Sequence, residues 1–415
     1  MIKKMTNGIK YWGQLFLLPI YWLSFLFPRS KNIWLFGSTF GRRFADNPRY
    51  AYLYVNQFKD DVAKLNKGKN IRGIWISHNK EVVRFLQEKG YEAYYNHSFK
   101  GMWYCLRGKV YIFDNYSKDI SFWLSGGTKK INLWHGTATK KINQDNKFDY
   151  YRNPRNAWER FKTMPRRITD EKPHHYVLAT SKQMAPILAG AFGTSLEHTL
   201  VVGHPRNDIL LRGDMTDILN EDEKKTVTQL EEFRKSEKKI IFYTPTFRES
   251  ETKFFDVIDL EKLNDFLATR DYIWCNKLHI KSKLKKRFED IDLSNIFNID
   301  ADVDPATILP YCDFMVADYS SIYLDYMFLD RPAVAFPFDY EEYVTSSREC
   351  YFDYEEYMPE KKVYTQEELE QAIDNIFYVD DKLEARRKRR SFHFDEVDGE
   401  SSHRLCESII NILEK

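Results

Sequence analysis

The feature that most constrains the fold is a regular alternation of short apolar runs with longer amphipathic segments, which begins near residue 32. Strands that alternate with helices form βαβ units around a parallel sheet, so the sequence predicts an α/β protein. In the first half of the chain we expect strands at 32–37, 71–77, 110–114, 131–134, 176–180 and 199–203. In the second half we expect strands at 239–244, 272–277, 296–298, 314–317 and 333–336.

The two series of strands are separated by a charged, helical connector at 211–238. We therefore expect two Rossmann-like doubly wound domains that face a cleft, since ligands of such sheets bind at the carboxyl ends of the strands. The predicted boundaries are a hydrophobic segment at 1–30, an N-terminal domain at 31–236, a C-terminal domain at 237–395 and a last helix at 396–415.

Composition excludes several classes of protein. The 63 basic and 61 acidic residues leave a net charge of +2, which argues against a dedicated nucleic-acid binder. The five cysteines lie far apart and form no CxxC pair, so a disulfide framework or a cysteine-based zinc site is not expected. Such cysteines fit a reducing cytoplasm.

An uncharged stretch covers residues 11–27 and is flanked by Lys and Arg on both sides. It is short for a membrane span, and Pro19 interrupts it. Trp and Tyr within it favour a membrane interface. We expect a segment that lies in the interface, with a membrane span and a helix packed on its own domain as the alternatives.

The segment 132–141 (NLWHGTATKK) contains the end of the predicted strand 131–134 and the polar side chains that follow it. His135 lies at the carboxyl end of the strand and is followed by Gly136, which permits close approach of a ligand to the backbone. A histidine here is suited to act as a general base. A loop-capping histidine is the equally weighted alternative.

Three later segments also follow predicted strands. Arg248 lies in YTPTFRE, and its guanidinium can grip a phosphate, although a surface salt bridge is the commoner role. Lys277 and His279 alternate along an extended stretch and share one face. Ser320 and Ser321 precede a helix, where hydroxyls and free N–H groups can bind phosphate or simply cap the helix. The recurrence of such segments at strand ends favours a binding site.

Together these segments resemble the CDP-glycerol glycerophosphotransferase family, the enzymes of teichoic acid and capsule polymer synthesis. The resemblance is carried, in order, by residues 37–52, 132–142, 179–184, 203–210, 243–249, 277–279 and 312–336. It implies a fold of glycosyltransferase-B (GT-B) type, with transfer of a polyol phosphate, most often glycerol phosphate, from a CDP-activated donor to an acceptor hydroxyl and release of CMP.

The resemblance also implies roles for individual residues. His135 corresponds to the catalytic base, and Arg248 and His279 face the donor pyrophosphate. The predicted site assigns catalysis to His135 and His279, donor binding to Arg248, Lys277, Asp318, Ser320 and Ser321, and loop support to Gly136, Thr137, Arg206 and Asp208. No metal or other cofactor is expected, because cationic side chains can stabilise the charge on the leaving phosphate.

The expected partners are CDP-glycerol or CDP-ribitol, a lipid-linked saccharide or polyol-phosphate acceptor and an anionic membrane surface, with a homo-oligomer as a further option. The hydrophobic segment and basic stretches such as 386–390 are expected to contact the cytoplasmic face of the plasma membrane. The alternatives to glycerol-phosphate transfer are a CDP-ribitol ribitolphosphotransferase, a glycosyltransferase or epimerase of the same fold that uses a UDP-sugar, and a non-catalytic membrane-associated scaffold.

Overall fold

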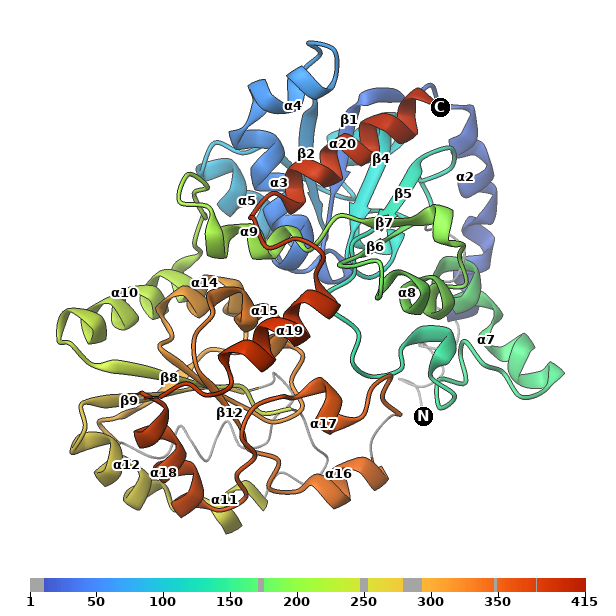
Figure 1. Ribbon diagram of the computed structural model, residues 1–415. Helices are drawn as coiled ribbons and strands as arrows, with labels where there is room; N and C mark the ends of the chain where they lie inside the picture. Colours follow the sequence, from blue (N-terminus) through green and yellow to red (C-terminus); the bar gives the residue numbers. More distant parts are fainter. Residues whose placement is uncertain (1–10, 171–174, 247–252, 279–292, 347–348, 378) are drawn as a thin grey trace, which may run out of the picture. The chain divides into compact units, whose positions relative to one another are not determined.

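The computed structural model describes residues 11–170, 175–246, 253–278, 293–346, 349–377 and 379–415. These residues belong to two α/β units (Figure 1). Unit 1 comprises Met1–Ile218 and Phe394–Lys415, and unit 2 comprises Leu219–His393.

Unit 1 is built on a parallel sheet of seven strands in the order β3-β2-β1-β4-β5-β6-β7. The strands are β1 Ser30–Phe36, β2 Arg72–Ser77, β3 Ala93–Tyr95, β4 Gly108–Phe113, β5 Lys129–Asn132, β6 Tyr176–Ala179 and β7 Thr199–Val201. The strand order reverses between β1 and β4, so that the loops after these strands flank the switch point at which doubly wound sheets bind ligands.

Helices cover both faces of the unit 1 sheet. The α-helices are α2 Leu18–Leu23, α3 Asp46–Gln57, α4 Lys59–Leu65, α5 Lys80–Glu88, α6 Phe99–Arg107, α7 Ala157–Asp170, α8 Ala185–Phe192, α9 Pro205–Leu211 and α20 Ser401–Glu414. Short 3-10 helices are η1 Gln14–Leu17, η2 Ser24–Leu26, η3 Thr39–Gly41, η4 Ser117–Asp119, η5 Asn143–Asp145 and η6 Leu196–His198. Leu35 and Tyr111 pack with Cys105 of α6, whereas Phe36 and Trp75 pack with Tyr52 of α3. Side chains that alternate along the strands thus feed two cores.

Unit 2 has a parallel sheet of five strands in the order β10-β9-β8-β11-β12. The strands are β8 Lys239–Tyr243, β9 Tyr272–Lys277, β10 Ile296–Ile299, β11 Phe314–Ala317 and β12 Ala333–Ala335. The helices are α10 Glu221–Lys235, α11 Lys253–Val257, α12 Leu260–Ala268, α14 Pro305–Ile308, η7 Leu309–Tyr311, α15 Ile322–Tyr326, η8 Met327–Leu329, α16 Tyr340–Ser346, α17 Tyr354–Tyr357, α18 Gln366–Ile376 and α19 Leu383–His393. One buried core joins Trp274 and Phe314 of the sheet to Leu263 of α12 and Ile373 of α18.

The predicted α/β fold with parallel strands is confirmed, and every predicted strand has a counterpart in the two sheets. Sequence patterning missed β3, because a strand of three residues has too short an apolar run to be distinguished from a loop.

The division of the chain into two units differs from the predicted domain boundaries at helices α10 and α20. Helix α10, expected in the N-terminal domain, belongs to unit 2, where it contacts β8 and α14. The last helix, α20, belongs to unit 1 and packs on α3, α4 and α9. The cause is the apolar face of α20, which buries Leu405, Ile409 and Leu413. No local pattern identifies the surface on which such a face packs.

The hydrophobic segment forms η1, α2 and η2, and one side of it packs on unit 1. The Tyr21 ring stacks on Phe122 with centroids 4.8 Å apart, and the Ser24 hydroxyl accepts a hydrogen bond of 2.8 Å from the backbone nitrogen of Gly126. Phe16, Trp22 and Leu26 of the same segment are exposed. Within the described part of the chain, no helix has the length and apolar character that a membrane crossing requires.

Candidate functional site

His135 lies beyond the carboxyl end of β5, in a turn that begins with an unusual backbone conformation. Trp134, which precedes it, has a φ of +54°, in the left-handed region that bulky residues rarely adopt. The His135 side chain is exposed, and its Nδ1 lies 3.4 Å from the carbonyl oxygen of Asp114. A carbonyl oxygen only accepts hydrogen bonds, so this contact places the proton on Nδ1 and leaves the lone pair on Nε2. In this tautomer Nε2 can accept a proton, as a general base does.

The electrostatics of His135 favour the neutral ring. One part of the His135 side chain reaches solvent, but protein packed around the turn desolvates the ring and lowers the pKa of His135 below its ordinary value. The positive charge of Arg206 acts in the same direction. Asp114 opposes this shift through its charge and its backbone contact. A neutral imidazole can accept a proton near neutral pH, as a catalytic base must.

A strained loop follows β1 beside the same switch point. Thr39, Phe40 and Gly41 have successive φ values of +51°, +55° and +75°. A Cβ at Gly41 would lie 2.4 Å from the His78 ring, so this position also excludes other residues on steric grounds. Strain of this kind persists only where the surroundings impose it, and it concentrates at functional sites.

Two buried carboxyl groups impose the conformation of this loop. Asp114 accepts hydrogen bonds from the Ser38 hydroxyl at 2.6 Å and from the backbone nitrogen of Thr39 at 2.9 Å. Asp119 accepts one from the backbone nitrogen of Phe40 at 2.9 Å. Burial raises the pKa of Asp119 well above its usual range, and the charge of Asp114 adds to this effect. Patterning gave no role to either aspartate, although Asp114 ends a predicted strand.

The predicted loop residues of unit 1 have different surroundings. Arg206 Nη1 donates to the His135 carbonyl oxygen at 2.9 Å and pairs with Asp46 at 3.0 Å. Gly136 and Thr137 are buried next to His135. Asp208 instead accepts hydrogen bonds from the backbone nitrogens of Ser401 and Ser402, the first residues of α20. The structure therefore places Arg206, Gly136 and Thr137 at the His135 turn. Asp208 instead has a structural role, because it binds the start of α20.

In unit 2, Asp318 joins the loops that follow β8 and β11. Its two carboxylate oxygens accept from the backbone nitrogen and the hydroxyl of Thr246, both at 2.8 Å. These strands are neighbours at the point where the strand order of unit 2 reverses. Asp318 thus anchors the start of the segment that leads to Arg248, which lies outside the described residues.

Ser320 and Ser321 follow Asp318 directly. The Ser320 carbonyl oxygen accepts a hydrogen bond of 2.9 Å from the Tyr357 hydroxyl. Ser321 is the N-cap of α15, but its side chain makes no capping hydrogen bond to that helix. An ordinary helix cap therefore does not account for its hydroxyl.

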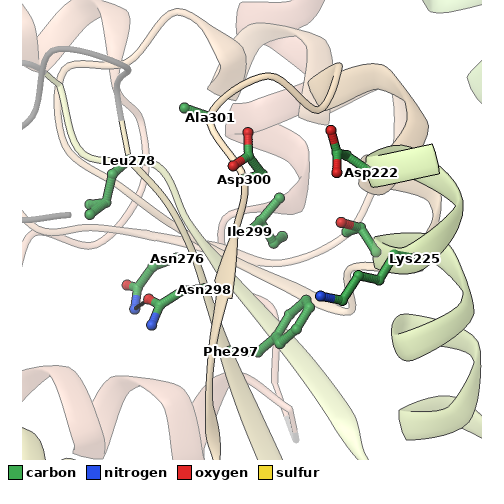
Figure 2. Close-up of a pocket in the computed structure, with 10 residues that line it drawn as sticks. Asp222, Lys225, Asn276, Leu278, Phe297, Asn298, Ile299, Asp300 and Ala301 are labelled. Atoms are coloured by element: carbon green, nitrogen blue, oxygen red, sulfur yellow. Dashed lines mark hydrogen bonds between the residues drawn. The ribbon is translucent and has the colours of Figure 1, made fainter. Parts of the chain in front are cut away.

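Lys277 ends β9, and its Nζ donates to the Ala301 carbonyl oxygen at 2.9 Å. His279, two residues further, lies outside the described residues. The Lys277 bond joins the carboxyl ends of β9 and β10, where the structure has a cavity of about 250 Å³ (Figure 2). It is lined by Asp222, Lys225, Thr226, Asn276, Leu278, Phe297, Asn298, Ile299, Asp300 and Ala301.

The polar groups of this cavity come from both strands and from α10. The Asn276 and Asn298 amides lie side by side, with Asn276 Nδ2 donating to Asn298 Oδ1 at 3.3 Å (Figure 2). Asp222 and Lys225 extend from α10. Amides, charged groups and the Phe297 ring together suit a polar ligand with a flat face. Among the residues that the structure describes, no cluster of three or more His, Cys, Asp or Glu has the arrangement of a metal site.

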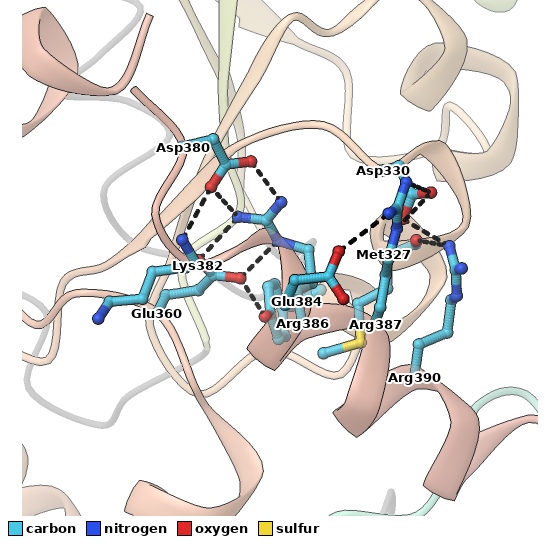
Figure 3. Close-up of polar contacts among 10 residues, drawn as sticks. Met327, Asp330, Glu360, Asp380, Lys382, Glu384, Arg386, Arg387 and Arg390 are labelled. Atoms are coloured by element: carbon cyan, nitrogen blue, oxygen red, sulfur yellow. Dashed lines mark hydrogen bonds and ion pairs between the residues drawn. The ribbon is translucent and has the colours of Figure 1, made fainter. Parts of the chain in front are cut away.

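The arginines of the basic run 386–390 form ion pairs within unit 2 (Figure 3). Arg386 is fully buried and pairs with Glu360 at 2.7 Å and with Asp380 at 2.8 Å. Arg387 and Arg390 both pair with Asp330, at 3.0 Å and 2.7 Å. These pairs hold α19 against the rest of unit 2, and the buried Arg386 does not reach the protein surface.

Comparison with known proteins identifies relatives of the whole chain. A family model described as CDP-Glycerol:Poly(glycerophosphate) glycerophosphotransferase matches residues 20–411. The teichoic acid glycerol-phosphate transferase of Staphylococcus aureus is 26% identical over 404 residues, which cover 92% of this chain and 93% of the relative. The teichoic acid ribitol-phosphate polymerase TarL of the same species is 28% identical over 245 residues, which cover 55% of this chain and 40% of TarL. The chain thus matches less than half of the polymerase but nearly all of the glycerol-phosphate transferase.

Solved structures show the same fold. The wall teichoic acid polymerase TagF matches with a TM-score of 0.69 at 22% identity, over 100% of this chain and 98% of the TagF chain. MnaA of S. aureus, solved with UDP, matches with a TM-score of 0.51 at 14% identity, over 92% of this chain and 96% of MnaA. At these identities the likeness concerns the fold, which is of the GT-B type.

Proposed function

Because the chain belongs to the CDP-glycerol:poly(glycerophosphate) glycerophosphotransferase family, we propose that it transfers glycerol phosphate from CDP-glycerol to a hydroxyl group and releases CMP. The acceptor in this proposal is a lipid-linked saccharide or a growing polyol-phosphate polymer of teichoic acid synthesis. The observation that carries the proposal is the nearly end-to-end match to a teichoic acid glycerol-phosphate transferase.

His135 is the proposed base of the reaction. The acceptor hydroxyl attacks the β-phosphorus of the donor and forms a new P–O bond, while the bond from this phosphorus to the bridging oxygen breaks. The proton of the hydroxyl passes to Nε2 of His135, whose lone pair is free because Nδ1 contacts the Asp114 carbonyl. The bond electrons leave with CMP. Unit 1 would thus supply the base.

Unit 2 is proposed to bind the donor. Arg248 and His279 are assigned to the pyrophosphate on the resemblance, and both follow strands of the unit 2 sheet. The hydroxyl of Ser321, which makes no capping hydrogen bond to α15, and that of the neighbouring Ser320 are assigned to the same phosphates. Helix α15 has only five residues, so the hydroxyl groups rather than a helix dipole support this assignment. Asp318 would keep the loops after β8 and β11 together through Thr246.

The cavity at the ends of β9 and β10 is the proposed position of the donor nucleoside. Its amide pair, Asn276 and Asn298, can exchange hydrogen bonds with the polar edge of a pyrimidine, and Phe297 offers an aromatic face. Lys277, two residues before His279, donates a hydrogen bond to Ala301, which lines this cavity. We expect Asn298→Ala to raise KM for the CDP donor with little change in kcat, which steady-state kinetics would measure.

Membrane association is proposed for the hydrophobic segment alone. Phe16, Trp22 and Leu26 of this segment are 87%, 64% and 77% exposed. Such a face suits a peripheral position on a membrane surface, with the apolar side chains in the interface. A lipid-linked acceptor at the cytoplasmic face of the plasma membrane would then be within reach.

The test is CMP release from CDP-glycerol and from CDP-ribitol in the presence of a lipid-linked disaccharide, with UDP-sugars as controls. Acceptor-dependent CMP from CDP-glycerol that His135→Ala abolishes would support the proposal. CMP from CDP-ribitol alone would favour the second candidate, which the TarL match supports. Turnover of a UDP-sugar without CMP from either donor would overturn the proposal.

A further inference from the structure

The strained turn before His135 is held by two buried side-chain amides. The backbone nitrogen of Trp134 donates to Asn132 Oδ1 at 2.9 Å, and the Trp134 carbonyl oxygen accepts from Asn47 Nδ2 at 3.0 Å. Both asparagines are fully buried. Both backbone polar groups of the residue with a φ of +54° are thus bound by side chains, one from the preceding strand β5 and one from α3. The position of His135 depends on this support, because the left-handed conformation is unfavourable for Trp by itself.

Asn47 also connects this turn to α9. Its Oδ1 accepts a hydrogen bond of 3.2 Å from the backbone nitrogen of Arg206. Arg206 then returns to the same turn, because its Nη1 donates to the His135 carbonyl oxygen at 2.9 Å. The carbonyl oxygens on both sides of the His135 nitrogen and Cα are therefore held, one by Asn47 and one by Arg206. The starts of α3 and α9 form a clamp on the turn.

The chemistry of this clamp requires an amide at position 47. One end of the side chain donates to Trp134, and the other end accepts from Arg206. An aspartate has the same shape but, when ionised, only accepts, so it would present an oxygen to the Trp134 carbonyl. Asp46, the preceding residue, already pairs with Arg206 at 3.0 Å. A second carboxylate would add repulsion at a buried position.

We infer that Asn47 is a positioning residue for His135, which it acts on through the Trp134 carbonyl and through Arg206. The inference rests on the proposed role of His135 as the base. Asn47 has no proposed contact with substrate, so its effect is on the direction of the imidazole. A displacement of about 1 Å in a reacting group can lower a rate by about 10²-fold.

The first test compares Asn47→Asp with Asn56→Asp. Asn56 lies on the same helix α3, and its Nδ2 also donates to a backbone carbonyl oxygen, that of Tyr52, at 2.9 Å. We expect Asn47→Asp to lower kcat for CMP release by about 10- to 100-fold while KM for CDP-glycerol changes by less than about twofold. Asn56→Asp should retain the wild-type kcat. A folded Asn47→Asp variant with wild-type kcat would overturn the inference.

The second test does not require turnover. Histidine labelled with ¹³C at Cε1 gives one NMR signal per ring, and His135→Ala identifies the signal of His135. We expect Asn47→Asp to shift this signal and its titration midpoint, and Asn56→Asp to leave both unchanged. Loss of activity with an unmoved His135 signal would show a merely structural role and would also overturn the inference.

A third variant covers the case in which Asn47→Asp does not fold. Arg206→Met removes the other arm of the clamp and should also move the His135 signal; an unmoved signal would contradict the clamp. If the wild-type protein released no CMP from either CDP donor, the proposed function would fail. The NMR comparison would still decide whether Asn47 positions His135.

Discussion

The carboxylate of Asp208 accepts a hydrogen bond of 2.7 Å from the backbone nitrogen of Ser402, although 194 positions separate the two residues in the chain. Its other oxygen accepts from the backbone nitrogen of Ser401 at 2.9 Å. These are the first two residues of α20, whose own N-cap residue makes no side-chain capping bond. A carboxylate from α9 therefore caps the last helix of the protein, where N–H groups would otherwise be buried without a partner.

Removal of this cap is expected to destabilise unit 1. Asp208→Ala should lower the free energy of unfolding by about 1–3 kcal/mol, because two buried N–H groups lose their acceptor. Asp208→Asn keeps one acceptor oxygen, so its free energy of unfolding should lie between those of the wild type and Asp208→Ala. Urea denaturation followed by circular dichroism would measure this. Asp214→Ala, which removes an exposed partner of Arg212, is the control and should cost less than about 1 kcal/mol. Equal stability of Asp208→Ala and wild type would contradict the capping role.

The pH dependence of the proposed reaction should reflect the lowered pKa of His135. A base must be unprotonated, so activity should fall at acid pH as the ring gains its proton. Because desolvation and Arg206 lower the pKa of His135, this fall should occur below pH 6.5, the ordinary value. The profile of kcat/KM against pH would show it. Arg206→Met should move the acid limb upward, and a limb above pH 6.5 in the wild-type protein would contradict the expected environment.

His393 should make stability depend on pH. Its ring lies among Phe352, Tyr357 and Phe392, and neither ring nitrogen has a hydrogen-bond partner among the described residues. Burial lowers its pKa to about 3, and Arg389 adds to the shift. Between pH 6.5 and 3 the unfolded chain binds a proton that the folded chain does not. Stability should therefore fall as the pH falls below 6.5.

Through His393, the free energy of unfolding should fall by about 1.4 kcal/mol for each pH unit of acidification in that interval. His393→Phe should remove it, since a phenyl ring does not titrate. Unfolding free energies of both proteins at pH 7.0, 6.0 and 5.0 would test this. The wild type should lose stability relative to the variant as the pH falls, and a constant difference would show that the histidine is not buried as a neutral ring.

Breaking the buried ion pair of Arg386 and Glu360 should lower the free energy of unfolding far more than breaking the exposed ion pairs of Arg387. Both side chains are fully buried, and Glu360 also accepts a hydrogen bond from the Tyr323 hydroxyl. Arg386→Met leaves a buried carboxylate without its cation and should cost about 3–5 kcal/mol. Arg387→Ala breaks exposed pairs and should cost less than about 1 kcal/mol. Thermal unfolding would compare the two, and similar losses would contradict this difference.

The exposed face of the hydrophobic segment should bind membranes. Trp22→Glu combined with Leu26→Glu should abolish co-sedimentation with vesicles that contain anionic lipids, because each apolar side chain contributes about 1.5–3 kcal/mol on burial. Tyr21 and Ser24, which pack on unit 1, are left unchanged. Leu196→Glu alters a leucine in a separate segment that is 59% exposed, and it should bind as the wild type does. Undiminished binding of the double variant would contradict the assignment.

Local patterns predicted the elements that carry the candidate site, because strand and helix periods are properties of neighbouring residues. They placed His135 after β5 of the unit 1 sheet and Asp318 after β11 of the unit 2 sheet, each at the carboxyl end of a parallel strand. They did not predict that Asp114 and Asp119 hold the loop after β1, since these contacts join separate βα units. They also did not predict the ion pairs of the basic run, because Asp330 and Glu360, which pair with it, are distant in the chain.

What the sequence alone determined is therefore the α/β class, the approximate strands and the kinds of side chain at their carboxyl ends. Only the tertiary structure decided that Asn47 binds the turn before His135, that Asp208 caps α20 and that the final helix returns to unit 1. The physical reason is that hydropathy period and turn chemistry act over a few residues. A hydrogen bond between a buried amide and a distant carbonyl instead depends on how whole elements pack, which no short segment encodes.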